Sequence, residues 1–343
     1  MKLLITGGGG FLGARLARTL LARGTLAGHA ITRMVLTDLA APPADLLGDP
    51  RVEARTGALL TQTEALREEA FDGVFHLASA VSGECEADFD LGLRSNLDST
   101  RALLDALRSH ATSHVKAGAP APRLVFSSSV AVFGPDPAVP LPALVGDTTL
   151  PAPQTSYGTQ KLICEHLVAD YTRKGYIDGR AARLMTVTVR PGRPNGAASS
   201  FFSGIIREPL AGAEAICPVD PSTAHSLSSP TRTVDGLIAV FEASREAFNG
   251  RTAMNLPGLN VRVADMLDAL EAVAGRAVRD RVRFVHDARV AHIVGNWARA
   301  TSAARAANLG LTAPTDFREI IRQYIDDCAA ANDADQTLRG LSR

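Results

Sequence analysis

Residues 2–13 read Lys-Leu-Leu-Ile-Thr-Gly-Gly-Gly-Gly-Phe-Leu-Gly, and this stretch decides the fold. The apolar run at residues 3–5 is too short for a helix and predicts a buried strand. Gly7, Gly10 and Gly13 follow at the spacing G-x-x-G-x-x-G. Beyond them an apolar residue recurs every fourth position, at Leu12, Leu16 and Leu20, which predicts a helix with one apolar face. A dinucleotide-binding loop requires this order of strand, glycine turn and helix, although a glycine-rich turn of another α/β protein is the alternative.

The three glycines have separate tasks in such a loop. Gly7 allows a tight turn, Gly10 lets the backbone approach a pyrophosphate, and Gly13 lets the helix pack against the strand. The N-terminus of the helix, at Phe11 and Leu12, offers free N–H groups and the positive end of its dipole to the phosphates. These five residues are therefore predicted to contact the cofactor.

An acidic residue at the end of the next strand supports this interpretation. Residues 31–37 predict a second strand, and Asp38 ends it. A carboxylate there accepts hydrogen bonds from both hydroxyls of a ribose and repels a 2′-phosphate. No arginine follows Asp38 directly to neutralise such a phosphate, and residues 24–29 predict an extended turn that lengthens the segment. The predicted cofactor is NAD rather than NADP.

Length and composition indicate an ordinary globular protein. The 343 residues suit one large α/β domain or a nucleotide-binding domain with a smaller partner. The 36 basic and 36 acidic residues cancel, so charge gives no reason to expect a nucleic acid or an anionic membrane as partner. No apolar run is long enough to span a bilayer.

The cysteines and the start of the chain predict a cytoplasmic location. The four cysteines lie far apart and form no C-x-x-C pair, which is typical of a reducing compartment; they are Cys85, Cys164, Cys217 and Cys328. A strand that begins at residue 2 leaves no room for a signal peptide. No His, Cys or Asp cluster has the spacing of metal ligands, because Cys164 and His166 face different sides of one helix.

Strand and helix patterns alternate through the first half of the chain. Further strands are predicted at residues 51–56, 71–79, 123–126 and 186–190, and helices at residues 61–69, 91–107 and from 156 onward. Surface loops are expected at residues 112–122 and at 134–153, the latter near the mouth of the site. This alternation predicts an α/β protein with a Rossmann-type doubly wound parallel sheet.

The second half of the chain lacks the regular alternation of strands and helices. Residues 1–190 are predicted to form the NAD-binding domain, and residues 191–343 mainly a smaller domain that caps the substrate. Helices are predicted in this half at residues 203–210, 265–274 and 317–327. Residues 252–256 are expected to return to the main sheet.

One histidine invites a catalytic role. His76 lies in the fourth predicted strand, which ends in the small residues Ala78 and Ser79, against which the nicotinamide half of the cofactor could lie. Its position inside a strand favours a packed, hydrogen-bonded core histidine over a catalytic base.

Ser129, Tyr157 and Lys161 are the best candidates for chemistry. Tyr157 and Lys161 are four residues apart and share one face of the predicted helix. A hydroxyl group that is oxidised must lose a proton, and a free phenol with a pKa of about 10 is a poor base at neutral pH. A nearby ammonium group favours the phenolate, so Tyr157 could then take the proton while Ser129 orients the reacting oxygen. Lys161 would also reach the nicotinamide ribose.

These motifs together resemble the extended short-chain dehydrogenase/reductase superfamily, also known as the NAD-dependent epimerase/dehydratase superfamily. The resemblance spans nearly the whole chain and implies that Leu77, Ala78, Ser79 and Asn96 contact the cofactor. It also makes a homodimer through paired helices an expectation. One departure is that Gly57 is followed by Ala58-Leu59, without the aspartate that often contacts adenine, so adenine must be held by other groups.

The superfamily contains several kinds of enzyme. Val130-Ala131 stand where a dehydratase carries Asp-Glu, and Val132-Phe133-Gly134 stand where epimerases usually have Val-Tyr-Gly. Residues 190–201, together with residues 205–210 and 216–219, closely resemble the D-erythronate dehydrogenase family. That resemblance implies NAD-dependent oxidation of a four-carbon sugar acid at C2, which gives 2-dehydro-D-erythronate. A nucleotide-sugar epimerase or reductase, and a binding protein that senses NAD, remain alternatives.

A small carboxylate substrate needs a cation or a cluster of hydrogen-bond donors. Arg207 and Arg232 lie in the half of the chain that should form the cap and are candidates, although either could be a salt-bridged surface residue. Ser79 and Ser82 could supply hydroxyls, and Ser129 and Tyr157 are expected to contact the reacting hydroxyl of the substrate.

Overall fold

The computed structural model describes residues 1–116, 120–192, 197–331 and 334–341. Its centre is a seven-stranded sheet in the order β12-β8-β7-β6-β1-β4-β5, in which every neighbouring pair is parallel. These strands are β1 (Lys2–Thr6), β4 (Arg33–Asp38), β5 (Val52–Thr56), β6 (Gly73–His76), β7 (Arg123–Ser129), β8 (Asp178–Leu184) and β12 (Met254–Asn255). The chain leaves β1 toward β4 and β5, then returns to β6 on the other side of β1. This reversal confirms the predicted doubly wound sheet and places its switch point between β1 and β6.

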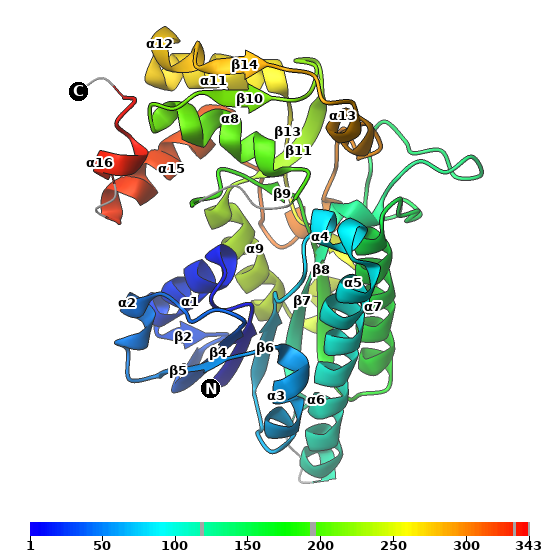
Figure 1. Cartoon of the computed structure of the whole chain (residues 1–343). Helices are drawn as coiled ribbons and strands as arrows, with labels where there is room; N and C mark the ends of the chain where they lie inside the picture. The colour runs from blue at the N-terminus through cyan, green and yellow to red at the C-terminus, as the bar shows by residue number, and fades with distance from the viewer. Residues whose placement is uncertain (117–119, 193–196, 332–333, 342–343) are drawn as a thin grey trace.

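Helices cover both faces of this sheet (Figure 1). On one face lie α1 (Phe11–Arg23) and α9 (Pro230–Glu242), whose apolar side chains join those of β1 and β4 in one core. On the other face lie α3 (Leu59–Arg67), α6 (Ser99–Lys116) and α7 (Ser156–Arg173), with a second core. A parallel sheet is buried on both faces in this way, which explains the apolar runs inside its strands at residues 3–5, 34–36 and 124–126.

A separate layer lies over one end of the main sheet (Figure 1). It contains the three-stranded sheet β13-β11-β9 and the parallel pair β10 and β14. Its own apolar core includes Phe202, Ile206, Leu270 and Ile321. The elements of this layer are β9 (Thr186–Val187), α8 (Ser200–Leu210), β10 (Ala215–Cys217), β11 (Ala224–Ser228), β13 (Leu259–Arg262), α11 (Val263–Ala274), α12 (Arg276–Arg279), β14 (Val282–Phe284), α13 (Ala288–Gly295), α15 (Phe317–Ala330) and α16 (Ala334–Thr337).

Short elements complete the connections. They are β2 (Thr25–Leu26), β3 (His29–Ala30), α2 (Ala44–Leu47), α4 (Ser82–Ala87), α5 (Phe89–Gly92), the π-helical turn η1 (Leu93–Asp98), the 3₁₀ turn η2 (Val130–Val132), α10 (Arg245–Phe248) and α14 (Ala304–Ala307). The extended turn predicted at residues 24–29 overlaps the antiparallel hairpin of β2 and β3, which spans residues 25–30.

Two sequence predictions about elements are wrong. The sixth strand of the main sheet is β8 rather than residues 186–190, because β9 pairs with β11 in the other layer. The loop predicted at residues 112–122 begins too early, since α6 continues to Lys116; residues 117–119 lie outside the described part of the chain. The predicted return of residues 252–256 is confirmed, because β12 pairs with β8.

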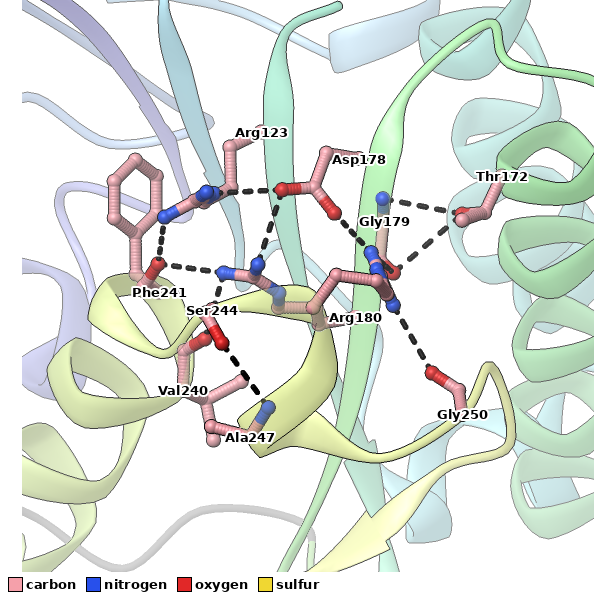
Figure 2. Close-up of polar contacts among 11 residues, drawn as sticks. Arg123, Thr172, Asp178, Gly179, Arg180, Val240, Phe241, Ser244, Ala247 and Gly250 are labelled. Atoms are coloured by element: carbon pink, nitrogen blue, oxygen red, sulfur yellow. Dashed lines mark hydrogen bonds and ion pairs between the residues drawn. The ribbon is translucent and has the colours of Figure 1, made fainter. Parts of the chain in front are cut away.

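A group of charges fastens α9 to the main sheet (Figure 2). Arg180 lies on β8 with no exposed surface and donates hydrogen bonds to the carbonyls of Val240 and Phe241, at 3.0 and 2.6 Å. Arg123 on β7 donates to the Phe241 carbonyl at 2.7 Å, and both arginines pair with Asp178. The last turn of a helix carries unpaired carbonyls and the negative end of the dipole, which guanidinium groups stabilise. A segment from the second half of the chain is thereby held on the nucleotide-binding sheet.

Candidate active site

A cavity of about 1260 Å³ lies at the switch point of the main sheet, where the carboxyl ends of the strands meet the other layer. Its walls include the glycine loop, Asp38, residues 77–84, residues 127–131, Tyr157 and Lys161. Residues from the second half of the chain complete the lining, among them Arg190, Ser199, His225, Arg289 and Trp297. Phe133 and Gln154, which flank the loop at residues 134–153, line the cavity, whereas no residue within that loop does.

Four glycines of this loop leave no room for a Cβ: Gly7, Gly8, Gly9 and Gly13. Gly7 has φ +73°, and a Cβ there would lie 2.8 Å from the Ala78 nitrogen. A Cβ on Gly13 would lie 2.0 Å from the Gly7 carbonyl oxygen. Gly10 has no such clash, since the nearest atom would be 3.3 Å away, and its open side lets the backbone approach a ligand in the cavity. The geometry fits a dinucleotide diphosphate at the N-terminus of α1.

Asp38 stands beside this loop at the end of β4. Its Oδ2 accepts hydrogen bonds from the N–H groups of Gly9 and Gly10 at 3.0 and 3.1 Å, and Oδ1 accepts one from Ala40 at 3.3 Å. The carboxylate is thus fixed at the cavity wall. Nearby, Gly57 and residues 58–60 line the cavity where the expected adenine-binding aspartate is absent.

The structure brings Ser129, Tyr157 and Lys161 together. Ser129 ends β7, and its hydroxyl accepts a hydrogen bond from the Ala131 N–H at 3.1 Å and contacts the Tyr157 phenol. The Lys161 ammonium is buried, donates to the Ser127 carbonyl at 2.9 Å and lies 5.5 Å from the centre of the Tyr157 ring. All three side chains line the cavity.

The pKa values of these groups differ from the sequence-based expectation. Burial raises the pKa of Tyr157 to about 12, and the hydrogen bond from Ser129 and the charge of Arg190 oppose that rise only in part. Burial also lowers the pKa of Lys161 to about 8. Desolvation disfavours the charged form of each group, so the protein alone does not produce the lowered phenol pKa that was expected.

His76 is a core histidine, as predicted. It is 1% exposed, and its Nδ1 and Nε2 lie 2.6 and 2.8 Å from the hydroxyls of Thr6 and Thr100. Burial lowers its pKa to about 3, and it is not among the lining residues. Its imidazole therefore joins β6 to β1 and to α6.

Asn96 lies behind the cavity wall rather than in it. Its Oδ1 accepts hydrogen bonds from the Ala80 N–H at 2.7 Å and the Ser79 hydroxyl at 2.9 Å, and its Nδ2 donates to Gln160 at 2.8 Å. These hydrogen bonds support the loop after β6, and the direct cofactor contact of Asn96 stays a prediction. Leu77, Ala78, Ser79 and Ser82 of that region do line the cavity.

Neither arginine expected to bind the substrate carboxylate lines the cavity. Arg207 is buried, donates to the Arg190 carbonyl at 2.8 Å and pairs with Glu208 at 2.6 Å. Arg232 on α9 pairs with Glu319 at 3.1 Å. Glu208 on the same helix, α8, pairs with Arg207, and Glu319 on α15 pairs with Arg232, so both guanidinium groups already have acidic partners.

The cationic residue that sequence reasoning missed is Arg190. It lines the cavity close enough to Tyr157 that each charge affects the other's pKa. Its only sequence signal was its place at the start of the segment 190–201, whose residues 193–196 lie outside the described part of the chain. His225 was also missed; it is buried, stacks on Phe202 with ring centres 5.4 Å apart and has its pKa lowered by burial to about 4.

The described residues contain no group of three or more His, Cys, Asp or Glu side chains that could hold a metal ion. Within the same ranges, every helix is too short or too polar to cross a membrane.

A glycine-rich loop at a helix N-terminus, an acid at the end of the next main-sheet strand and a Tyr-x-x-x-Lys pair, all around one switch point, are typical of NAD-linked proteins of the doubly wound class. Residues 3–225 match the NAD dependent epimerase/dehydratase family, and the chain belongs to that family. Its cofactor is NAD.

Relatives align along almost the whole chain. A protein from Cupriavidus necator named D-erythronate dehydrogenase is 49% identical, over 96% of this chain and 100% of its own length. A protein of the same name from Haemophilus influenzae is 40% identical, over 95% of this chain and 99% of its own length. The crystal structure of a nucleoside-diphosphate-sugar epimerase from Agrobacterium tumefaciens is 41% identical, with a TM-score of 0.89 over 96% of this chain and 95% of that one.

Proposed function

We propose that this protein oxidises D-erythronate at C2 with NAD and forms 2-dehydro-D-erythronate, NADH and a proton. The observation that carries the proposal is the 49% identity, over the full length of the relative, to a protein named D-erythronate dehydrogenase. The arrangement of Ser129, Tyr157 and Lys161 at the cavity supports it, because alcohol oxidation needs a base beside the reacting hydroxyl.

In the proposed mechanism Tyr157 accepts the proton of the C2 hydroxyl, and Ser129 donates a hydrogen bond that orients the oxygen. NAD, when bound, supplies the acceptor for the hydride that leaves C2. The phenol needs a positive neighbour to become a useful base, since burial raises its pKa to about 12. Lys161, whose ammonium is 5.5 Å from the centre of the Tyr157 ring, is proposed to stabilise the phenolate form of Tyr157. It is also proposed to reach the nicotinamide ribose.

The proposed cofactor contacts follow the cavity wall from one end to the other. Gly7, Gly10, Phe11, Leu12 and Gly13 would hold the diphosphate, because they surround the positive end of the α1 dipole. Asp38 would accept the ribose hydroxyls, and Leu77, Ala78 and Ser79 would lie against the nicotinamide half. Asn96 would act through Ser79 and Ala80, to which it is hydrogen-bonded.

The proposal also assigns different roles to the two halves of the chain. Residues 1–190 would bind NAD, and residues 191–343 would mainly cap the substrate. Support comes from the separate apolar core of the second layer and from the lining residues that it contributes. Residues 230–242 and 254–255 are exceptions, because α9 and β12 pack on the main sheet.

Accumulation of NADH tests the reaction. Purified protein with NAD and D-erythronate is expected to release NADH in proportion to the acid consumed, and Tyr157→Phe is expected to lose at least about 100-fold in kcat because the base is gone. NAD affinity, measured by calorimetry, should change little in this variant. Failure of the unmodified protein to reduce NAD with any four-carbon sugar acid would overturn the substrate, and an active Tyr157→Phe variant would remove the phenol from the mechanism.

A nucleotide-sugar epimerase is the second candidate, favoured by the 41% identity to a structure named as a nucleoside-diphosphate-sugar epimerase. An epimerase returns its hydride within each cycle, so it gives no net NADH. Incubation with a UDP-sugar, followed by separation of the sugar epimers, distinguishes the two reactions.

We also propose that the protein is a cytoplasmic homodimer that pairs through helices such as α6 and α7. The support is an exposed apolar residue on α7, Ile163, and the four cysteines, all of which are buried and free. Light scattering after gel filtration is expected to give twice the chain mass, and a monomer mass would contradict the dimer. Fractionation of cells that make the protein tests the compartment.

A further inference from the structure

Arg190 is a partly buried cation at the cavity, and it lacks a counterion within the described part of the chain. Among the residues that the structure describes, Arg190 has no carboxylate partner, and its side chain donates one hydrogen bond, from Nη2 to the Ser199 hydroxyl at 3.0 Å. Arg207 beside it is different, because its guanidinium is paired with Glu208. A partly buried charge without a partner is costly, so a site that keeps one is suited to an anionic ligand.

Among the described residues, the groups around Arg190 do not neutralise its charge. Burial and the like charge of Arg207 both lower the pKa of Arg190, and only the phenol of Tyr157 raises it. With a reference value near 12.5, the guanidinium stays charged at neutral pH. Arg190 therefore presents a positive charge that the neighbouring residues do not neutralise.

A helix terminus adds to this positive region. The eleven-residue helix α8 begins at Ser200, and its N-cap, Ser199, forms no side-chain cap of its own. Residues 197–199 line the same cavity as Arg190. The N-terminal end of a helix carries a partial positive charge that favours an anion.

The other cations at the cavity are less suited to hold a small anion. Arg94 and Arg289 are exposed, where water screens an ion pair strongly. The Lys161 ammonium already donates a hydrogen bond to the Ser127 carbonyl. Arg190 is the partly buried guanidinium, and its planar fork can bind both oxygens of a carboxylate.

We infer that Arg190 binds the carboxylate of the substrate and so selects both a 2-hydroxy acid and its C2 carbon; this rests on the proposed oxidation of D-erythronate. In such an acid the carboxyl carbon is bonded directly to the carbon that bears the reacting hydroxyl. Arg190 and Tyr157 are near enough for each to shift the other's pKa. A carboxylate held by Arg190 therefore brings the C2 hydroxyl to Tyr157 and leaves the hydroxyls of C3 and C4 further away.

The test compares an acid with its amide. The unmodified protein, Arg190→Gln and the control Arg262→Gln are assayed with NAD and either D-erythronate or D-erythronamide; Arg262 is exposed and pairs with Asp265. Arg190→Gln is expected to lower kcat/KM for the acid by about 30-fold or more and to change the value for the amide much less. An unchanged ratio of acid to amide would overturn the role of Arg190.

A binding measurement separates this inference from the proposed reaction. The single tryptophan, Trp297, lines the cavity and reports binding by its fluorescence. In the Tyr157→Phe background, which stops turnover, D-erythronate is titrated into protein with NAD, with and without Arg190→Gln. Binding that depends on Arg190 would support the inference even where no NADH is formed, a result that refutes only the reaction. Equal binding in both, or binding in neither, would refute the inference.

Discussion

The charge of a single side chain is expected to choose between NAD and NADP. Asp38 is fixed at the cavity wall by hydrogen bonds from Gly9, Gly10 and Ala40, so its carboxylate would lie near the adenosine ribose. Asp38→Asn keeps the shape and removes the repulsion of a 2′-phosphate. The ratio of kcat/KM for NADP to that for NAD should rise about tenfold, as expected for loss of a charge–charge interaction near a protein surface.

Asp45→Asn is a matched control for this change. Asp45 pairs with Arg18 on the exposed side of α1 and is not among the cavity residues. The control should leave the cofactor ratio unchanged. Steady-state rates with each cofactor measure the effect, and an equal ratio in Asp38→Asn and the unmodified protein would show that the carboxylate does not select the cofactor.

Residue roles follow from sequence where local geometry determines them. Tyr157 and Lys161 were predicted together because four residues make one turn of a helix, and α7 places both at the cavity. Arg207 and Arg232 do not line the cavity, because the partner of a side chain depends on tertiary packing. Arg190 was missed for the same reason, since its relation to Tyr157 arises only when the second layer covers the main sheet.

At the scale of elements, β8 shows where apolar patterning fails. Its sequence, Asp-Gly-Arg-Ala-Ala-Arg-Leu, carries charges at three of seven positions, so residues 186–190 gave a clearer strand pattern. In the folded protein each of these charges has a partner. Arg180 pairs with Asp178 and donates to the end of α9, and Arg183 pairs with Glu165. A strand can therefore be buried with charges when neighbouring elements supply the partners, which its own sequence does not reveal.

Breaking the pair of Glu165 on α7 and Arg183 on β8 is expected to destabilise the fold strongly. Both side chains are at most 6% exposed; Glu165 accepts hydrogen bonds from Arg183 at 2.8 and 2.7 Å and from the Ser128 hydroxyl at 2.5 Å. Glu165→Gln leaves a buried guanidinium without its counterion. The free energy of unfolding in urea should fall by about 3 kcal/mol or more.

A second substitution separates the charge from the packing. Adding Arg183→Met to Glu165→Gln removes the unpaired cation, so the double variant should regain part of the lost free energy of unfolding. The single variant Arg183→Met completes the comparison. If the losses of the two single variants add up to the loss of the double variant, the two charges do not stabilise the protein as a pair.

For the whole molecule, the order of elements predicted the central sheet because right-handed βαβ units leave few arrangements. The layer over the sheet was less predictable, since its strands are short and pair across long separations, as β9 does with β11 and β10 with β14. Residues 230–242 also cross back to the main sheet through contacts of Arg123 and Arg180, far from them in sequence. Such contacts exist only after folding.

Two buried histidines are expected to make the folded protein sensitive to acid. Burial lowers the pKa of His76 to about 3 and that of His225 to about 4, from a reference of 6.5. Below pH 6.5 both imidazoles become protonated in the unfolded chain, whereas in the folded protein they stay neutral until the pH is much lower. Stability is therefore retained above pH 6.5 and falls as the pH drops toward 4 for His225 and toward 3 for His76. Between pH 7 and pH 5 the loss should be about 2 kcal/mol per histidine.

Removing one histidine should remove its share of this acid sensitivity. His225 donates from Nδ1 to the Ala298 carbonyl at 3.0 Å, and His225→Gln can keep a donor there while losing the titrating ring. Urea unfolding at pH 7, 6 and 5 should give a shallower fall for His225→Gln than for the unmodified protein, by about 1 kcal/mol per pH unit. His29→Gln, in the exposed hairpin, is the control and should keep the full slope. If His225→Gln and His29→Gln lose stability in parallel as the pH falls, the buried imidazole of His225 does not link folding to protons.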